Sequence, residues 1–369
     1  MCGIFTVYNT DYRWDSLEDS FNKISYRGPD SSSHLHVNNK LTMAFHRLAI
    51  MGLSDSGNQP MKHPNDDSLT LMCNGEIYNY KVLAQKYNFN LSTGSDCEII
   101  LHLFKELGLM KTINQLDGVF MFTIYDEIND ILYAGRDPMG VRPGFIANTE
   151  DETIISSEAK TLIKFSKNII PFPPGTWWSS DNPSKFERYF HYDSNKPSSD
   201  NENVLLGNVK SLLVEAVLKR LMSEREIGCL LSGGLDSSLI ASIVSKNYSG
   251  GKLNTFSIGI ESSIDLQYAQ IVANFIQSNH HSIQISEKEF LDAIETVIYN
   301  IESYDTTTVR ASVGNYLVSK YIKENTDCKV IFNGDGSDEV CCGYLYLRNA
   351  PNSKDLQLES EKLVKELYL

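Results

Sequence analysis

In the first half of the chain, hydrophobic residues come in short runs rich in aromatic and β-branched side chains. Such runs predict β-strands, which we expect at 3–9, 41–50, 69–79 and 119–126, with another after the Asn-Asp turn at 129–130. Helical spacing of Ile99, Leu103 and Leu107 predicts a helix over 96–107, with Ser95 or Asp96 as its N-cap. This half should therefore form stacked, mainly antiparallel sheets with helices outside.

The second half has a different pattern, in which fully apolar runs alternate with segments of helical periodicity. We expect strands at 227–232, 253–260, 281–286 and 328–334, and helices at 204–222, from 237, at 263–278, at 287–301 and around 313–324. This alternation predicts a doubly wound parallel sheet with helices on both faces. Ligands of such sheets bind beyond the carboxyl ends of the strands.

A polar stretch rich in Ser, Asn and Asp separates the two patterns at 181–203 and contains Pro183 and Pro197. It is the best linker candidate, and a length of 369 residues suits two domains. We expect a first domain at 2–190, a linker at 191–203 and a second domain at 204–369.

Composition narrows the class of protein. The net charge of −14, from 47 acidic and 33 basic residues, argues against nucleic acid as a partner. No apolar stretch approaches the length of a membrane span, and no signal peptide precedes the first strand. The seven cysteines are odd in number and lack C-x-x-C spacing, as in a reducing compartment. We expect a cytoplasmic protein with no membrane partner.

The stretch "SGGLDSS" at 232–238 follows a buried strand and opens a helix. Free amides at a helix start, with nearby serine hydroxyls, favour an anion. No Gly-Lys-Ser/Thr follows, so this is not a Walker A loop, and Asp236 suggests Mg²⁺ held against pyrophosphate. The alternative interpretation is a glycine turn between strand and helix with a serine cap.

Several motifs in order resemble known families. "SGGLDSS" resembles the pyrophosphate loop of ATP pyrophosphatases, whereas "MCGIF", "RGPD", "NGEIYN", "TGSD" and "GRDPMGVRP" resemble the glutaminase domain of class II glutamine amidotransferases. With "DTTTVRAS" and "GDGSDE", the set resembles the glutamine-hydrolysing asparagine synthetases along the whole chain. The resemblance implies an αββα sandwich of the N-terminal-nucleophile type, followed by a synthetase domain of the ATP-pyrophosphatase type.

For the first domain, the resemblance implies that Met1 is removed and that Cys2 attacks glutamine, with its own α-amine as general base. Asn74 and Gly75 would form the oxyanion hole. Arg47 would bind the α-carboxylate of glutamine, Ile50 and Met51 would line the pocket, and Glu76 and Asp96 would receive the α-ammonium group. Alternatives from the residues alone are a buried structural cysteine, a surface ion pair at Arg47, a helix cap at Asp96 and a hairpin turn at Asn74-Gly75.

For the second domain, the resemblance implies that ATP contacts the following residues: Leu230, Ser232, Gly233, Gly234, Asp236, Ser237, Ile258, Asn333 and Gly334. Asp236 and Asp338 would bind Mg²⁺, and Arg310 would contact aspartate or phosphate. The alternative for "NGDGSDE" is an acidic glycine-rich loop, or a weak calcium-type loop.

Two departures from the family pattern stand out. Asp335 replaces a glutamate that the family uses to form the adenylate, which retracts the carboxylate by one methylene group. In addition, family members continue well beyond the position of Leu369, so we expect the second domain to be shortened at its C-terminus.

The function expected from the resemblance is ATP-dependent synthesis of L-asparagine from L-aspartate through β-aspartyl-AMP, with ammonia from L-glutamine and with AMP and pyrophosphate as products. A homodimer is expected from the resemblance alone. The alternatives are a glutaminase with a synthetically inactive second domain, and a catalytically dead regulatory homologue. A β-lactam synthetase is disfavoured, because these enzymes often lack the N-terminal cysteine that is present here.

Overall fold

The computed structural model describes residues 1–10, 12–149, 152–191 and 200–367. The chain forms two compact units that separate near residues 193 and 194. We describe each unit by itself.

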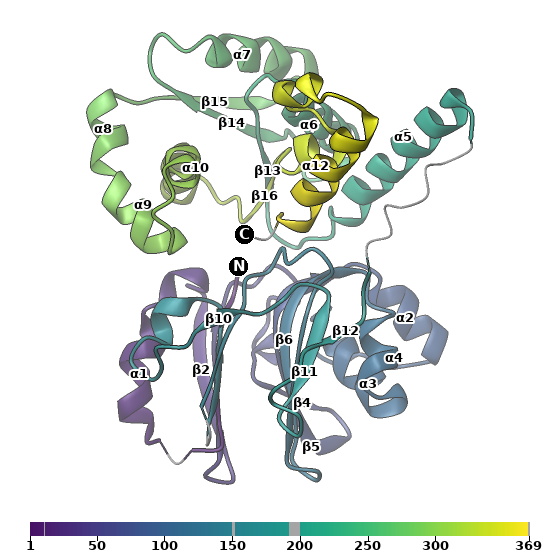
Figure 1. The fold of residues 1–369 in the computed structure, drawn as a ribbon, viewed down its shortest axis with the longest axis vertical. Helices are drawn as coiled ribbons and strands as arrows, with labels where there is room; N and C mark the ends of the chain where they lie inside the picture. Colours follow the sequence, from purple (N-terminus) through teal and green to yellow (C-terminus); the bar gives the residue numbers. More distant parts are fainter. Residues whose placement is uncertain (11, 150–151, 192–199, 368–369) are drawn as a thin grey trace. The chain divides into compact units, whose positions relative to one another are not determined.

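The first unit contains two six-stranded antiparallel sheets with helices on their outer faces (Figure 1). One sheet has the order β10-β8-β9-β1-β3-β2 and the other the order β12-β11-β7-β6-β5-β4. The strands are β1 (Gly3–Tyr8), β2 (Ser31–Val37), β3 (Leu41–Arg47), β4 (Met61–His63), β5 (Asp66–Ile77), β6 (Gly118–Asp126), β7 (Ile131–Arg136), β8 (Phe145–Asn148), β9 (Thr153–Ser156), β10 (Ile170–Pro171), β11 (Thr176–Ser179) and β12 (Glu187–Arg188). The helices are α1 (Trp14–Asn22), α2 (Tyr80–Tyr87), α3 (Glu98–Leu107) and α4 (Leu109–Ile113).

Strand β1 shows how the sequence builds these layers. Successive side chains of a strand point to opposite faces of its sheet. Ile4 packs in the core between the two sheets, and Phe5 packs in the core beneath α1, so both faces of the strand are buried. The αββα sandwich expected from the sequence is thereby confirmed.

The second unit is built on a parallel sheet of order β15-β14-β13-β16. Its strands are β13 (Ile227–Leu230), β14 (Asn254–Gly259), β15 (Asn279–Gln284) and β16 (Val330–Phe332). Its helices are α5 (Glu202–Lys219), α6 (Leu235–Asn247), α7 (Ile264–Ile276), α8 (Glu287–Asp292), α9 (Ile294–Ile301), α10 (Thr306–Asn325), α11 (Ser337–Cys341) and α12 (Ser353–Lys365).

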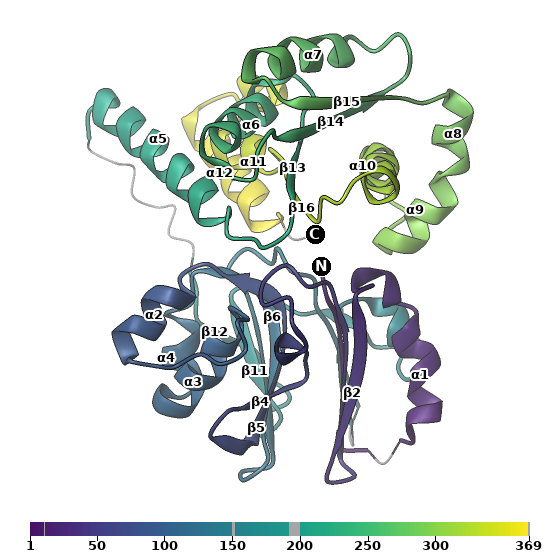
Figure 2. The ribbon, with the colours of Figure 1, turned by 180° about the vertical axis from the view of Figure 1, so that it is seen from behind.

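Helices cover both faces of this sheet, as the sequence predicts (Figures 1 and 2). On one face, Ala241 of α6 and Ala269 of α7 pack against Cys229 of β13. On the other face, Val318 of α10 packs against Phe256 of β14. The small alanine side chains allow α6 and α7 to lie close to the sheet.

Some expected elements differ in their bounds. The helix expected at 287–301 is divided into α8 and α9, and the one expected around 313–324 begins earlier, at Thr306. The helix expected at 96–107 begins at Glu98.

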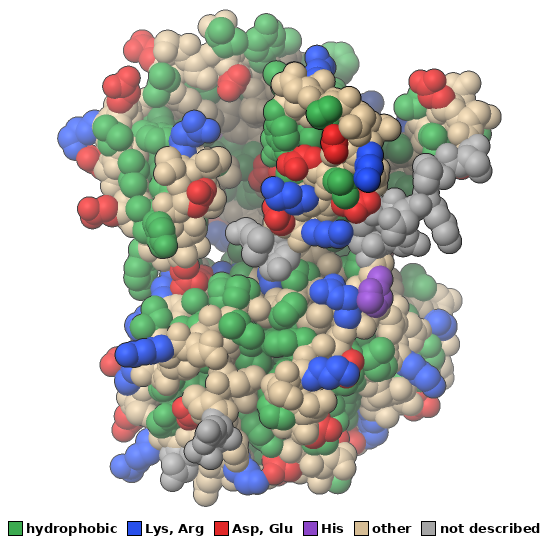
Figure 3. Space-filling view, viewed as in Figure 1, with side chains coloured by type: hydrophobic (Ala, Val, Ile, Leu, Met, Phe, Trp, Pro, Cys, Tyr) green, Lys and Arg blue, Asp and Glu red, His purple; other side chains and the backbone are tan. Residues whose placement is uncertain are grey.

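The surface of the second unit carries exposed hydrophobic side chains over α8 and α9, including Leu291 and Tyr299, and mixed charges over α12 (Figure 3). Within the described residues, no helix combines the length and the apolar character that crossing a bilayer requires. All seven cysteines are unpaired.

Candidate functional site

Cys2 precedes β1, and the fold brings the ends of β3 and β5 to it. Its Sγ accepts a hydrogen bond from the backbone N–H of Leu48 (3.4 Å) and lies 3.6 Å from the Leu48 carbonyl oxygen. Its backbone N–H donates to Asn74 Oδ1 of β5 (3.0 Å). The structure therefore places Cys2 next to Asn74 and next to Leu48, which follows Arg47 in the chain.

The side-chain amide of Asn74 has a fixed orientation. Because Oδ1 accepts from the N–H of Cys2, the Nδ2 group must point elsewhere, and it is buried with no hydrogen-bond partner. A buried, unpaired donor next to a thiol can stabilise an anion that forms only during a reaction. The hairpin-turn alternative for Asn74-Gly75 is wrong, because both residues lie inside β5.

Burial governs the ionisation of the nucleophile. It raises the pKa of the Cys2 thiol, against the opposing influence of the terminal ammonium group, the Leu48 backbone and Arg142. Burial also lowers the pKa of the terminal amine, which belongs to Met1 here, to about 5. An amine with so low a pKa is a free base at neutral pH.

Arg47 is buried and holds a loop. Its guanidinium donates to the Ser54 carbonyl (2.9 Å), to Asn58 Oδ1 (2.9 Å), and to the carbonyls of Met51 (3.3 Å) and Gly52. The alternative of a surface ion pair is therefore wrong. Ile50 and Met51 are half-buried where this loop begins.

Asp96 is only 4% exposed, and its Oδ2 accepts from the backbone N–H of Ile77 (2.6 Å). Burial, reinforced by the nearby charge of Glu76, raises its pKa to about 7. The predicted cap role is wrong, since α3 begins after Cys97 and receives no side-chain cap.

Arg142 is a residue of this site to which the sequence analysis gave no role. One of its terminal nitrogens lies 3.5 Å from Glu76 Oε2, and its Nε is buried without a partner. Its loop is fixed by Asp137, which accepts from the backbone N–H of Arg142 (3.0 Å). The sequence signal for Arg142 is its place in the "GRDPMGVRP" motif. The resemblance of this motif to the glutaminase family gave no role to its second arginine.

Glu98 is another residue near this site that the sequence motifs did not single out. Although burial opposes its ionisation, hydrogen bonds from His102, Thr93 and Ser92 lower its pKa to about 2. It accepts from the backbone N–H groups of Ser92 (2.9 Å) and Thr93 (2.7 Å). Glu98 thus holds the loop that leads into Asp96. The sequence signal that could have found it is an acidic residue directly before the apolar run of this helix.

In the second unit, the predicted phosphate loop forms the turn between β13 and α6. Ser232 Oγ lies 2.9 Å from Ser237 Oγ and accepts from the N–H of Gly234 (3.3 Å). Gly233 has a φ of +80°, and a Cβ there would come within 2.5 Å of the α7 backbone. The loop therefore requires glycine for its turn and for its close approach to α7.

The acidic loop after β16 lies against the same turn. A Cβ on Gly334 would come within 2.9 Å of the backbone nitrogen of Ser237 and 3.0 Å of Asp236 Cβ. Leu230 ends β13, and Ile258 stands next to the end of β14; both are half-buried. The carboxyl edge of the sheet thus gathers the predicted nucleotide contacts.

Asp335 accepts a hydrogen bond from Asn333 Nδ2 (2.7 Å). Desolvation, together with the neighbouring charge of Glu339, raises its pKa. Arg310 is exposed on α10, and no hydrogen bond among the described residues joins it to either loop. The structure therefore brings the two loops together, and among the described residues no hydrogen bond ties Arg310 to them.

No group of three or more metal-binding side chains occurs within the described residues. Asp236 and Asp338 each lie in the first turn of a helix at this edge, α6 and α11. Two carboxylates suit Mg²⁺, which commonly takes one or two from the protein and the rest from phosphates and water.

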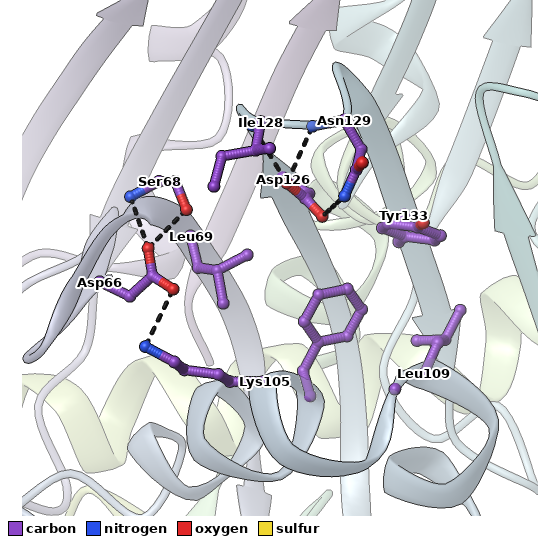
Figure 4. Close-up of a pocket in the computed structure, with 11 residues that line it drawn as sticks. Asp66, Ser68, Leu69, Lys105, Leu109, Asp126, Ile128, Asn129 and Tyr133 are labelled. Atoms are coloured by element: carbon purple, nitrogen blue, oxygen red, sulfur yellow. Dashed lines mark hydrogen bonds and ion pairs between the residues drawn. The ribbon is translucent and has the colours of Figure 1, made fainter.

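A separate cavity of about 350 Å³ lies at the other end of β5, where Asp66, Leu69 and Tyr133 line it (Figure 4). Its polar groups satisfy one another: Asp66 pairs with Lys105 (2.9 Å), and Asp126 accepts from the N–H groups of Ile128 and Asn129. It contains none of the predicted site residues.

Comparisons with known proteins match the two units of the chain to two different family models. A family model described as a glutamine amidotransferase domain matches residues 1–173, and one described as asparagine synthase matches residues 208–367. The chain is 43% identical, over an alignment 401 positions long, to the asparagine synthetase [glutamine-hydrolyzing] of Mus musculus, and the alignment covers 100% of this chain and 71% of that protein. The Homo sapiens protein of the same name is 41% identical with the same coverage.

Among solved structures, the chain is similar to a glutamine phosphoribosylpyrophosphate amidotransferase from B. subtilis. The alignment covers 90% of this chain and 91% of the amidotransferase chain. The TM-score is 0.46 and the sequence identity is 13%.

Proposed function

The chain belongs to the family of glutamine-hydrolysing asparagine synthetases, and on this premise we propose how its residues carry out the reaction. It uses ATP to make L-asparagine from L-aspartate, with glutamine as the nitrogen donor. We assign glutamine hydrolysis to the first unit and aspartate activation to the second. The two alternatives, an inactive second domain and a catalytically dead homologue, are not favoured.

The glutaminase reaction begins with loss of Met1. The nitrogen of Cys2 then becomes the terminal amine and serves as the general base that accepts the thiol proton. Cys2 Sγ attacks the carboxamide carbon of glutamine, and the same amine returns the proton to the departing nitrogen. Ammonia leaves, and water hydrolyses the thioester to glutamate.

The orientation of Asn74 is the observation that carries this proposal. During the attack the carbonyl oxygen becomes negatively charged, and we assign its stabilisation to Asn74 Nδ2 and the N–H of Gly75. A donor that is already buried and unpaired needs no reorganisation when this charge appears.

Side chains of both charges would bind the amino acid end of glutamine. We assign the α-ammonium group to Asp96 and Glu76. Arg47 supplies positive charge for the α-carboxylate, and it also fixes the loop that begins at Ile50 and Met51. Binding of the α-carboxylate would therefore depend on the loop that Arg47 holds.

In the second unit, we propose that the loops at Ser232–Ser237 and Asn333–Asp338 bind ATP at the carboxyl edge of the sheet, with Leu230 and Ile258 alongside. The aspartate β-carboxylate attacks the α-phosphorus, and pyrophosphate leaves. Ammonia then attacks the β-carbonyl carbon, and AMP leaves with the bond electrons. Asp335 and Arg310 are assigned to aspartate activation.

Asp236 and Asp338 would hold Mg²⁺, which when bound neutralises charge on the phosphates. We further propose that the reaction takes place in the cytoplasm, a proposal supported by seven unpaired cysteines. The homodimer remains a prediction from the family.

One assay tests the function. The purified chain is incubated with glutamine, with and without aspartate, ATP and Mg²⁺, while glutamate, asparagine, AMP and pyrophosphate are measured. Asparagine and AMP in equal amounts are expected. Glutamate alone would instead indicate a glutaminase with an inactive second unit, and no turnover from a chain with a free Cys2 amine would indicate a dead homologue.

A further inference from the structure

Helix α7 is apolar on two opposite sides. Its buried residues Leu266, Ala269 and Ala273 face the sheet, where the helix packs on β14 and β15. A second set of large apolar side chains is exposed to solvent: Ile264 (63%), Tyr268 (56%), Ile271 (62%) and Phe275 (80%). A helix that covers one face of a sheet needs only one apolar side, so the exposed set serves no purpose within the described part of this unit.

The spacing of the four exposed residues places them in one stripe along α7. They follow one another by four, three and four positions, a repeat of about 3.5 residues that stays on one side of a helix. At about 3.6 residues per turn, this stripe lies roughly opposite the buried residues. Figures 1 and 2 show α7 on the outer side of the second unit, with the sheet behind it. The stripe therefore faces outward.

A stripe with this repeat is typical of the contact line of a two-stranded coiled coil. Tyr268 and Phe275 take the a positions of the heptad, and Ile264 and Ile271 take the d positions. Exposed apolar patches that are continuous and large mark interaction sites. The stripe therefore fits the side of another helix that carries the same repeat.

Charge favours a second copy of this chain as the partner. Asp265 is the only Asp, Glu, Lys or Arg in α7. A helix that lies on a membrane carries Lys and Arg on its polar side, and α7 has neither. With a net charge of −14, two copies repel each other unless they meet where little charge is present. The outer side of α7 satisfies this condition.

The exposed area is sufficient for a specific contact. A fully exposed side chain of this size offers about 200 Å², so the stripe exposes about 500 Å². Two copies would together bury about 1,000 Å², near the lower limit for a specific protein interface. The expected dimer is therefore weak but specific.

The order of the side chains favours an antiparallel pair. With a two-fold axis at the middle of α7, Tyr268 meets the partner's Ile271, and Phe275 meets the partner's Ile264. Each ring then packs on a branched aliphatic side chain, and the two helix dipoles attract each other. A parallel pair would instead place like ends of the dipoles together.

We propose that the outer side of α7 is a docking surface for a second copy of this chain, which binds through an antiparallel pair of α7 helices. The contact adjoins the phosphate loop, because a Cβ on Gly233 would come within 2.5 Å of the Tyr268 backbone. Variants that test the contact therefore leave Tyr268 unchanged.

The first test is sedimentation equilibrium of the full chain over about 1–200 μM, a range suited to a weak interface. At the highest concentration, wild type should have at least about twice the mass of Phe275→Glu, whichever oligomer the other surfaces form. The dissociation constant should rise at least about 30-fold in this variant, because both copies in a dimer carry the charge.

Gln270→Glu is the matched control, because it adds the same charge at an exposed position of α7 outside the stripe. Its dissociation constant should stay within about twofold of wild type. Far-ultraviolet circular dichroism verifies that both variants fold. Equal masses for wild type and Phe275→Glu at every concentration would overturn the proposal, and the stripe would then be left to a different protein.

A charge exchange tests the orientation. Ile264→Glu and Phe275→Lys should each dissociate alone, yet associate when mixed in equal amounts. In an antiparallel pair, the new carboxylate of one copy meets the new ammonium group of the other, and the second contact between Phe275 and Ile264 remains native. A parallel pair offers no such contact. A mixture that dissociates as readily as either variant alone would overturn the antiparallel arrangement.

Discussion

At Asp96, a carboxyl group with a pKa of about 7 lies where we place the α-ammonium group of glutamine. Burial favours its neutral form, whereas an ammonium group needs the carboxylate. Binding of glutamine should therefore release a proton, and KM should fall as pH rises from 6 to 8. Steady-state glutaminase kinetics over this range would show it.

The matched variant is Asp96→Asn, which keeps an oxygen to accept from the Ile77 N–H but cannot ionise. Its KM should be higher at pH 8 and should not vary across this range. A wild-type KM that is constant with pH would show that Asp96 does not bind the ammonium group.

Asp335 provides a second residue-scale prediction. Asp335→Glu should extend the carboxylate by one methylene group and raise aspartate-dependent pyrophosphate release by about 10-fold or more, given the cost of a misplacement near 1 Å. Pyrophosphate is followed with ammonium as nitrogen donor, so that glutamine hydrolysis plays no part. A rate that is unchanged or lower would show that the shorter side chain is already well placed.

At the scale of elements, the glycine turn between β13 and α6 decides whether the second unit is stable. In Gly233→Ala, the new methyl group would meet the α7 backbone at 2.5 Å, at a φ of +80°. The free energy of unfolding of this unit should fall by about 2 kcal/mol or more. Denaturant titration measures this loss.

Gly234→Ala is the control, because its Cβ would meet only Ser232 Oγ at an ordinary 3.4 Å and Gly234 has a φ of −69°. Its free energy of unfolding should be close to that of the wild type. Equal stabilities for the two variants would mean that the turn relaxes away from α7.

Strands and helices were predicted well where their hydrophobic pattern was strong, as in β1 and α7. The predicted helix bounds were wrong where a cap or a tertiary contact decides where a helix starts or breaks. Asp305 caps α10 by accepting from the N–H of Thr308 (2.8 Å), so the helix starts through three threonines that favour strands by themselves. The break between α8 and α9 accompanies the packing of Val297 against Val313 of α10.

At the scale of the whole molecule, the two reactions are assigned to different units and should be separable. Cys2→Ala should abolish glutamine hydrolysis, because no thiol remains, yet leave asparagine synthesis from ammonium salts at the wild-type rate. Asparagine is measured with each nitrogen donor. Glutamate production by the variant would show that Cys2 is not the nucleophile.

The sequence by itself determined the order of the elements, the two contrasting architectures and the residue types at each site, because periodicity and motif spacing are local properties of a chain. Only the tertiary structure decided which way the Asn74 amide points, that Arg47 holds a loop, and that Arg27 joins Glu158 to Cys2. These contacts link residues as far apart as 72 and 131 positions. Strand pairing and core packing bring positions so far apart in the sequence into contact, and no local pattern specifies these pairings.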